Sequence, residues 1–194
     1  MWSCYKGNNC HTSCVSGSPA LKGSLLWSYD TGEKINASPV TINNILYTVT
    51  EEGTLYALTG DSGNLLWKYK DSDEGNNGVK KFPPLVIDDT VYFTGKNGSI
   101  YSISADRGDV RWKYETGGII NSSPAILGDM LYTGTVGGTV YAIDIAGGEK
   151  KWSFHTGGIC VSSPVIYGGM LFTAADNIFY VIDIERGEKR WAYT

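Results

Sequence analysis

Short apolar stretches alternate with turn residues along almost the whole chain, and this arrangement returns roughly every 40 residues. In the clearest unit, four such stretches follow one another at 120–127, 130–135, 139–145 and 150–155. Glycine-containing pairs separate them, which we interpret as two-residue hairpin turns: Gly128-Asp129, Gly137-Gly138 and Gly147-Gly148. Four short strands joined in this way form one antiparallel sheet, as in the blade of a β-propeller.

Tryptophan marks the repeat most clearly. It recurs at steps of 40, 45, 40 and 39 residues, at Trp27, Trp67, Trp112, Trp152 and Trp191. Each has a glycine four positions earlier. A proline follows 12 residues after three of them and 17 residues after Trp67, and two aromatic residues come after each of these prolines. A period near 40 together with β-favouring residues is typical of a propeller or a β-solenoid. We therefore predict an all-β fold in which the aromatic residues pack between neighbouring sheets.

Two of the units resemble a known family. Residues 142–152 and 181–191 read AIDIAGGEKKW and VIDIERGEKRW, which resemble the tryptophan-docking motif of PQQ-like β-propeller repeats. Ser122-Ser123-Pro124 and Ser162-Ser163-Pro164 are similar to the start of the family's innermost strand, whereas Thr59 and Ser104 replace the motif's aspartate. The family includes quinoprotein alcohol dehydrogenases, the assembly factor BamB and sensor propellers, so the resemblance implies a fold and leaves function open.

The family's strand order, with tryptophan on the outermost strand, divides the chain into four four-stranded blades. They cover about 33–70, 78–115, 118–155 and 157–193, after a lead-in segment at 1–24 and an extra outer strand at 25–29. The family usually closes seven or eight blades, so we expect an incomplete ring. Two chains closing an eight-bladed ring, a tight four-bladed ring and a longer protein remain open, and we favour the first or the third.

Charge and hydropathy narrow the possible partners. A net charge of −4 and the absence of any basic cluster argue against a nucleic-acid partner. No run of about 18 apolar residues predicts a transmembrane helix. The opening Met1–Cys4 does not read as a signal peptide, which is consistent with the cytoplasm, whereas the family resemblance favours the periplasm or cell surface. Localisation therefore stays open.

The sequence offers little catalytic or metal-binding chemistry. Cys4, Cys10 and Cys14 permit a disulfide in an oxidising compartment, and their redox state stays open. With His11 they make a weak candidate zinc site, and the acidic insertion at 71–78 is a weak calcium candidate that lacks the EF-hand register. We expect no metal ligand and no catalytic residue.

The family's enzymes place adjacent cysteines beneath the quinone and hold calcium with carboxylates and amides. This sequence has no adjacent cysteines. The positions three residues before the inner-strand prolines also carry no carboxylate, since they are Asn36, Lys81, Asn121 and Val161. We therefore predict that the chain binds no cofactor.

We predict instead a non-enzymatic scaffold that binds a protein or peptide. The candidate contacts lie on the axis side and in the inserted loop, at Asn36, Lys80, Lys81, Asn121, Asp71, Asp73 and Glu74. The two adjacent lysines would attract an acidic segment. Exposed blade edges are expected to cause self-association. The alternatives are a fragment of a PQQ-dependent dehydrogenase and a ligand-sensing propeller of a larger signalling protein.

Overall fold

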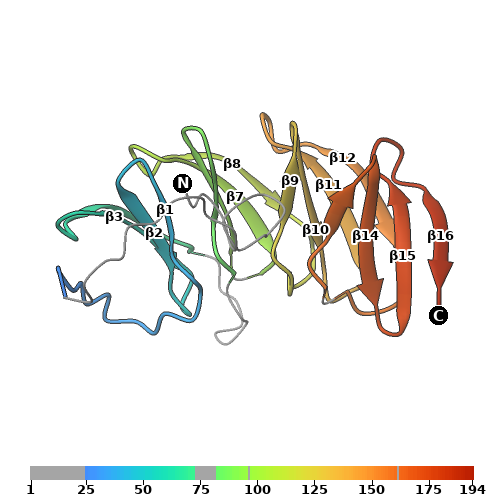
Figure 1. Ribbon diagram of the computed structural model, residues 1–194, viewed down its shortest axis with the longest axis horizontal. Helices are drawn as coiled ribbons and strands as arrows, with labels where there is room; N and C mark the ends of the chain where they lie inside the picture. Colours follow the sequence, from blue (N-terminus) through green and yellow to red (C-terminus); the bar gives the residue numbers. More distant parts are fainter. Residues whose placement is uncertain (1–24, 73–81, 96, 161) are drawn as a thin grey trace.

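The computed structural model describes residues 25–72, 82–95, 97–160 and 162–194, and within them the chain forms four antiparallel sheets and no helix (Figure 1). The first sheet contains β1 (Val40–Ile42), β2 (Ile45–Val49), β3 (Thr54–Thr59) and β4 (Leu65–Lys70). The second contains β5 (Leu85–Ile87), β6 (Thr90–Thr94), β7 (Ser99–Ser104) and β8 (Val110–Glu115). The third contains β9 (Ala125–Leu127), β10 (Met130–Gly134), β11 (Thr139–Asp144) and β12 (Lys150–His155). The fourth contains β13 (Val165–Tyr167), β14 (Met170–Ala175), β15 (Ile178–Asp183) and β16 (Lys189–Tyr193).

The four sheets stand side by side in chain order, with the first and the fourth at opposite ends of the molecule (Figure 1). Within each sheet the strands follow in sequence, so the first strand lies at one edge and the tryptophan strand at the other. The first strands of neighbouring sheets approach each other, as β1 does β5 and β9 does β13. This arrangement is an open arc of propeller blades, which confirms the predicted fold class and the incomplete ring.

Two details of the third unit differ from the sequence-based expectation. The stretch at 120–127 forms only the short strand β9, with a single bridge between Ile120 and Thr135. Pro124 has no backbone N–H, which helps explain why regular pairing begins only after it. Gly128-Asp129 is a two-residue turn, since Leu127 pairs with Met130, but the other two turns are longer. They contain Gly138 and Gly148 at φ of 77° and 74°, where glycine adopts the left-handed conformation easily.

Residues 25–29, expected as an extra outer strand, pair with no strand among the described residues. A strand of this kind needs a neighbour that supplies ladder hydrogen bonds, and the described chain places none beside it. The segment nevertheless lies against the first sheet through the side chain of Trp27.

An indole ring joins each sheet to the next. Trp67, Trp112 and Trp152 each donate the indole N–H to a backbone carbonyl of the following sheet, at 2.8–2.9 Å, and Trp27 does the same to the first sheet. The acceptors are Gly60, Ala105, Ile145 and Ile184. Three residues after each acceptor, a glycine with positive φ lies directly beneath the ring: Gly63, Gly108, Gly148 and Gly187. The repeated spacing of glycine and tryptophan in the sequence therefore reflects one contact made four times.

A second hydrogen bond runs in the opposite direction, from each sheet back to the chain that precedes it. The tyrosine of each third strand donates its hydroxyl to the segment that precedes its own sheet, at 2.8–3.2 Å. The pairs are Tyr56 with Thr31 O, Tyr101 with Asp71 Oδ1, Tyr141 with Thr116 O and Tyr180 with Thr156 O. Neighbouring sheets are thus held by polar contacts from both sides of an apolar core.

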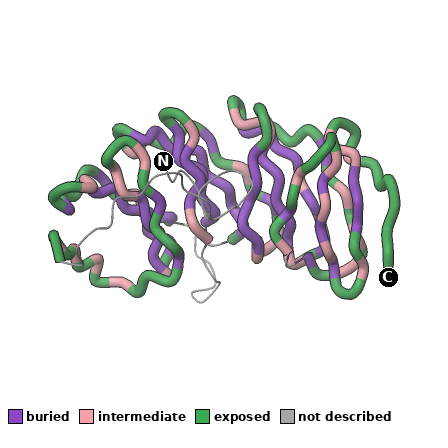
Figure 2. Tube along the Cα trace, viewed as in Figure 1, coloured by how far each residue is buried: buried purple, intermediate pink, exposed green. Residues whose placement is uncertain are grey.

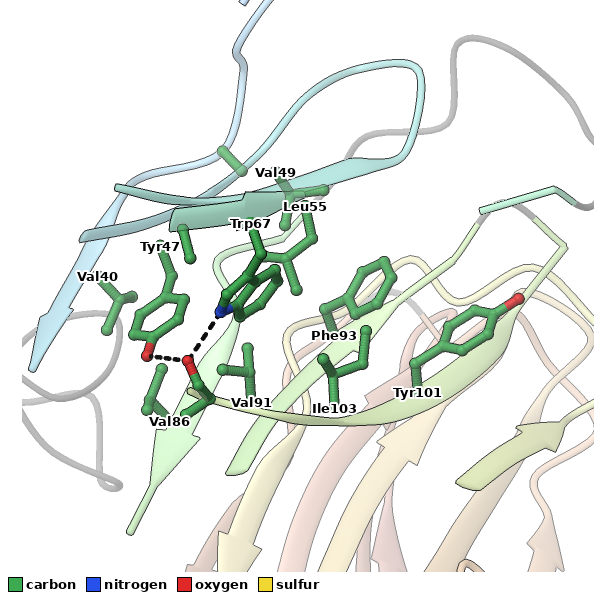
Figure 3. Close-up of a cluster of buried hydrophobic side chains, with 13 residues drawn as sticks. Val40, Tyr47, Val49, Leu55, Trp67, Val86, Val91, Phe93, Tyr101 and Ile103 are labelled. Carbon is green, nitrogen blue, oxygen red and sulfur yellow. Dashed lines mark hydrogen bonds between the residues drawn. The ribbon is translucent and has the colours of Figure 1, made fainter. Parts of the chain in front are cut away.

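The core between the first and second sheets shows how the aromatic residues share acceptors (Figure 3). Tyr47 and Trp67 lie 5.9 Å apart between ring centroids, and both donate to the carbonyl of Ala105, at 3.1 and 2.9 Å. Tyr47 is only 1% exposed. Burial, with a smaller contribution from the negative charge of Asp106, raises the pKa of Tyr47 to about 12. The phenol is therefore held neutral as a hydrogen-bond donor.

Gly148→Ala should destabilise the protein more than Gly117→Ala. Both glycines have a φ near 73°, so both substitutions carry the left-handed strain of about 1–2 kcal/mol. At Gly148 the new Cβ would also lie 2.6 Å from the Trp112 ring, whereas at Gly117 nothing lies within 4 Å. We expect the clash to add about 1–3 kcal/mol, measured as the difference in unfolding free energy in urea. Equal losses in the two variants would contradict the ring-on-glycine contact.

Tyr47→Phe should alter the alkaline stability of the protein. The unfolded chain ionises Tyr47 near pH 10, whereas the folded chain holds it neutral to about pH 12. The contribution of Tyr47 to the free energy of unfolding is therefore complete below pH 10 and is lost as the pH rises to 12. We expect Tyr47→Phe to lose about 1 kcal/mol at pH 7 and to show a shallower loss of stability between pH 10 and 12 in urea titrations. Parallel curves for the two proteins would contradict the raised pKa.

Candidate functional site

The predicted axis-side residues are only partly within the described chain. Asn36 is exposed and Asn121 is half-buried. Each follows the bridge residue that precedes an inner strand, Ile35 or Ile120. They belong to the first and third sheets, so the second sheet stands between them (Figure 1). Lys80, Lys81, Asp73 and Glu74 lie outside the described residues, as do the cysteines Cys4, Cys10 and Cys14.

Asp71 belongs to the contact between sheets. It directly follows β4, is 1% exposed and accepts a hydrogen bond from the Tyr101 hydroxyl at 2.8 Å. It occupies the repeat position that is threonine in the other units, and its carboxylate closely approaches Gly95, where a Cβ would clash with it. The sequence placed Asp71 on a partner-binding loop, but its burial leaves no surface that a partner can reach. Its repeat position, four residues after tryptophan, was the signal for this structural role.

Two arginine–carboxylate pairs involve the outer strands of the second and fourth sheets. Arg111 on β8 contacts Asp89 at 2.6 Å, and the hydrogen bond from its guanidinium lowers the pKa of Asp89 to about 2. Arg190 and Asp183 make a similar pair on the fourth sheet, at 2.5 Å. Each pair ties an outer strand to its own sheet, so their charges serve local geometry.

Cys160 and His155 offer no catalytic arrangement with the residues around them. Cys160 is fully buried, and burial raises the pKa of its thiol, which keeps it protonated. His155 is exposed at the end of β12 and lies 3.3 Å from the Thr139 hydroxyl. Across the described ranges, no three His, Cys, Asp or Glu side chains come together as a metal site would require.

The quinone and calcium of the dehydrogenases that the repeat motif resembles do not fit the residues described. Asn36 and Asn121 supply amides at the inner-strand positions, but no carboxylate accompanies them there. A calcium ion prefers several carboxylate and carbonyl oxygens around it. The sequence also has no adjacent cysteines, since its four lie at positions 4, 10, 14 and 160. We therefore derive no chemistry through that cofactor.

The fourth sheet departs most from the repeat in burial, on the face that carries Trp191. Among the apolar residues that register places on the side that carries tryptophan, five are exposed: Val165, Tyr167, Phe179, Trp191 and Tyr193. We call these five the uncovered face. Trp191 is 48% exposed, whereas Trp67, Trp112 and Trp152 are each 9% exposed. Figure 2 shows β16 exposed along its length, whereas the equivalent strands β4, β8 and β12 are each buried at their tryptophan.

An apolar surface of this kind is typical of a contact with another protein surface. Phe179 is 40% exposed, yet its equivalents Leu55, Ile100 and Val140 are at most 1% exposed because the next sheet covers them. The uncovered face therefore has the same composition as three internal interfaces and lacks only the opposing sheet. Sequence analysis anticipated exposed edges but did not identify these residues as a surface.

An open arc of four tryptophan-bearing blades, with an uncovered apolar face at one end, defines a repeat protein of the β-propeller class. The family model described as "Outer membrane protein assembly factor BamB" matches residues 15–119 and 115–194. The chain belongs to this family of PQQ-like propellers. No curated protein matches the chain.

Solved structures agree on the fold. BamB from Moraxella catarrhalis has a TM-score of 0.71 at 19% identity, over 87% of this chain and 56% of BamB. A europium-containing methanol dehydrogenase has a TM-score of 0.79 at 16% identity, over 100% of this chain and 48% of the enzyme. The chain thus spans about half the length of these two proteins. The computationally designed protein Ika4 matches over 99% of its own length and 84% of this chain, with a TM-score of 0.70 at 17% identity.

Trp112→Ala and Trp191→Ala should differ sharply in stability. Trp112 is buried against the next sheet and donates to Ile145 O at 2.8 Å, so its loss should cost about 3–5 kcal/mol. Trp191 lacks such a partner within the described chain, and we expect a loss of about 1 kcal/mol or less. Urea unfolding followed by circular dichroism measures both. A large loss from Trp191→Ala would mean that another part of the chain covers this face.

Proposed function

We propose that this protein is a non-enzymatic propeller that binds other proteins, including further copies of itself. The uncovered face carries the proposal, because it exposes residues of the kind that the repeat buries three times elsewhere. Family membership supports it, since the family is described by a factor that assembles outer membrane proteins. The dehydrogenases share only the fold at 16–18% identity, and the described residues do not fit their cofactor.

A second contact region is proposed at the axis-side ends of the inner strands. Asn36 is exposed there, Asn121 is half-buried, and both carry amides that hydrogen-bond to peptide groups. Lys80, Lys81, Asp73 and Glu74 lie outside the described residues and are included in this proposal from the sequence alone. Asp71 is left out, since it is buried against Tyr101. The proposed ligand of this region is an acidic peptide segment, attracted by the two lysines.

Charge reversal at Lys80 and Lys81 should weaken binding of a poly-glutamate peptide. Each lost ion pair is worth about 0.2–1 kcal/mol at an exposed site, so the dissociation constant should rise roughly 2- to 30-fold. Fluorescence anisotropy with a labelled peptide at 50 mM salt measures it. Lys150→Glu/Lys151→Glu is the matched control, because it reverses two adjacent exposed lysines on β12. An equal effect of both double variants, or no effect of either, would count against this contact region.

A further inference from the structure

Trp27 makes the contacts of an outer strand without belonging to a sheet. Its indole N–H donates to Gly60 O at 2.9 Å, and its ring lies on Gly63. Two residues later, Tyr29 packs on Tyr56 with ring centroids 6.0 Å apart. The Tyr56 hydroxyl then donates to the carbonyl of Thr31 at 3.2 Å. Residues 25–31, which we call the Trp27 segment, therefore occupy the position where a preceding blade would dock.

Strand β16 carries the same two aromatic residues at the same spacing. Trp191 and Tyr193 correspond to Trp27 and Tyr29, and they are 48% and 74% exposed. Within the protein, the equivalent pair Trp112 and Tyr114 packs on the following sheet, the indole on Gly148 and the phenol on Tyr141 at 6.0 Å. The first sheet offers that acceptor set through Gly60, Gly63 and Tyr56. The fourth sheet of one copy thus complements the first sheet of another, as a continuation of the internal interfaces.

Only one indole can occupy this acceptor. The ring of Trp27 lies so close to Gly63 that a single methyl group has no room beneath it, and Gly60 O accepts its N–H. The ring of Trp191 from a second copy would need the same surface of Gly63. The two tryptophans therefore exclude each other.

The Trp27 segment covers the first sheet only in part. Leu25 and Leu26 are 83% and 82% exposed, and Trp27 is half-buried, unlike the tryptophans between sheets. Ile35, at the entrance to the first sheet, is 48% exposed. Its equivalents in the third and fourth sheets, Ile120 and Cys160, are 3% and 0% exposed because a preceding sheet covers them. A complete sheet would bury more apolar surface here than the segment does.

From these observations we propose that the Trp27 segment is an intramolecular cap, which competes with β16 of a second copy for the first sheet. The inference rests on the proposed self-association and adds the element that controls it. A tethered segment acts at an effective concentration in the millimolar range, so it outcompetes a second copy at micromolar protein. Removing the indole frees the acceptor, and the copies then associate head to tail.

The first test compares wild type with Trp27→Ala by sedimentation velocity from 1 to 200 μM. We expect wild type to stay monomeric at low micromolar concentration and Trp27→Ala to associate at least tenfold more tightly. Trp27→Phe, which keeps a ring over Gly63 but loses the hydrogen bond to Gly60 O, should fall between them. Because the Trp27 segment lies outside the four sheets, unfolding in urea should show that all three proteins retain the folded core.

The second test fixes the direction of the contact. Trp27→Ala/Trp191→Ala has an open first sheet and a disabled fourth sheet, so it should stay monomeric alone. Mixed with wild type, whose Trp191 is intact, it should form a 1:1 complex that grows no further. Copies meeting through two fourth sheets would give no such complex, since one partner lacks Trp191.

If Trp27→Ala and wild type associate with equal affinity, the proposal that the Trp27 segment is a cap is wrong. If wild type and Trp27→Ala both associate equally, and Trp191→Ala abolishes this association, the copies still associate through the uncovered face. In that case only the proposed cap is wrong. If neither associates, and the mixture forms no complex, the proposed self-association fails with it. Association of Trp27→Ala/Trp191→Ala as tight as that of Trp27→Ala would likewise overturn the proposal, because the contact would not involve Trp191.

Discussion

The close approach of an indole ring to a glycine is the contact on which the rest of the arc depends. A β-sheet of four short strands has two faces and cannot bury both by itself. Here each of the first three sheets buries one face by placing its tryptophan on the backbone of the next, where the missing Cβ allows the ring to lie close against the chain. The indole N–H at the same time donates to a backbone carbonyl of that sheet, which gives the buried ring its hydrogen-bond partner.

This contact has a direction, and the direction explains why the two ends of the arc differ. Every sheet presents a donor ring on one side and an acceptor backbone on the other. At the start of the arc the acceptor side is occupied by Trp27, while at its end the donor side of Trp191 has no counterpart in the described chain. Burial follows the same asymmetry, since apolar residues of similar kind are covered in the middle and exposed on the fourth sheet (Figure 2).

The fold could be predicted from the sequence because its signals are periodic. Tryptophan returns about every 40 residues, always with a glycine four positions earlier, and the strand at 150–155 has the bounds expected for it. Boundaries next to Pro124 were less certain, since proline shortens regular pairing without removing the extended chain. Two turns were longer than predicted because glycine closes a wider loop at Gly138 and Gly148.

The candidate site was harder to predict, because composition does not show which face of a sheet lacks a neighbour. Asp71 illustrates the difficulty. An acidic residue beside a polar insertion suggests an exposed loop, yet its place in the repeat puts it under Tyr101. Trp191 illustrates the reverse case, since its local sequence matches that of Trp152 and only the absence of an opposing sheet among the described residues leaves it exposed.

The head-to-tail polarity of the indole contact also bears on how such an array can change in evolution. Donor and acceptor lie in each unit at a constant offset, with the glycine four residues before the tryptophan. An in-frame duplication or deletion of one whole unit would restore the same junction at the new boundary, whereas a shift of part of a unit would not. The number of blades can thus vary between descendants while every internal junction keeps its chemistry.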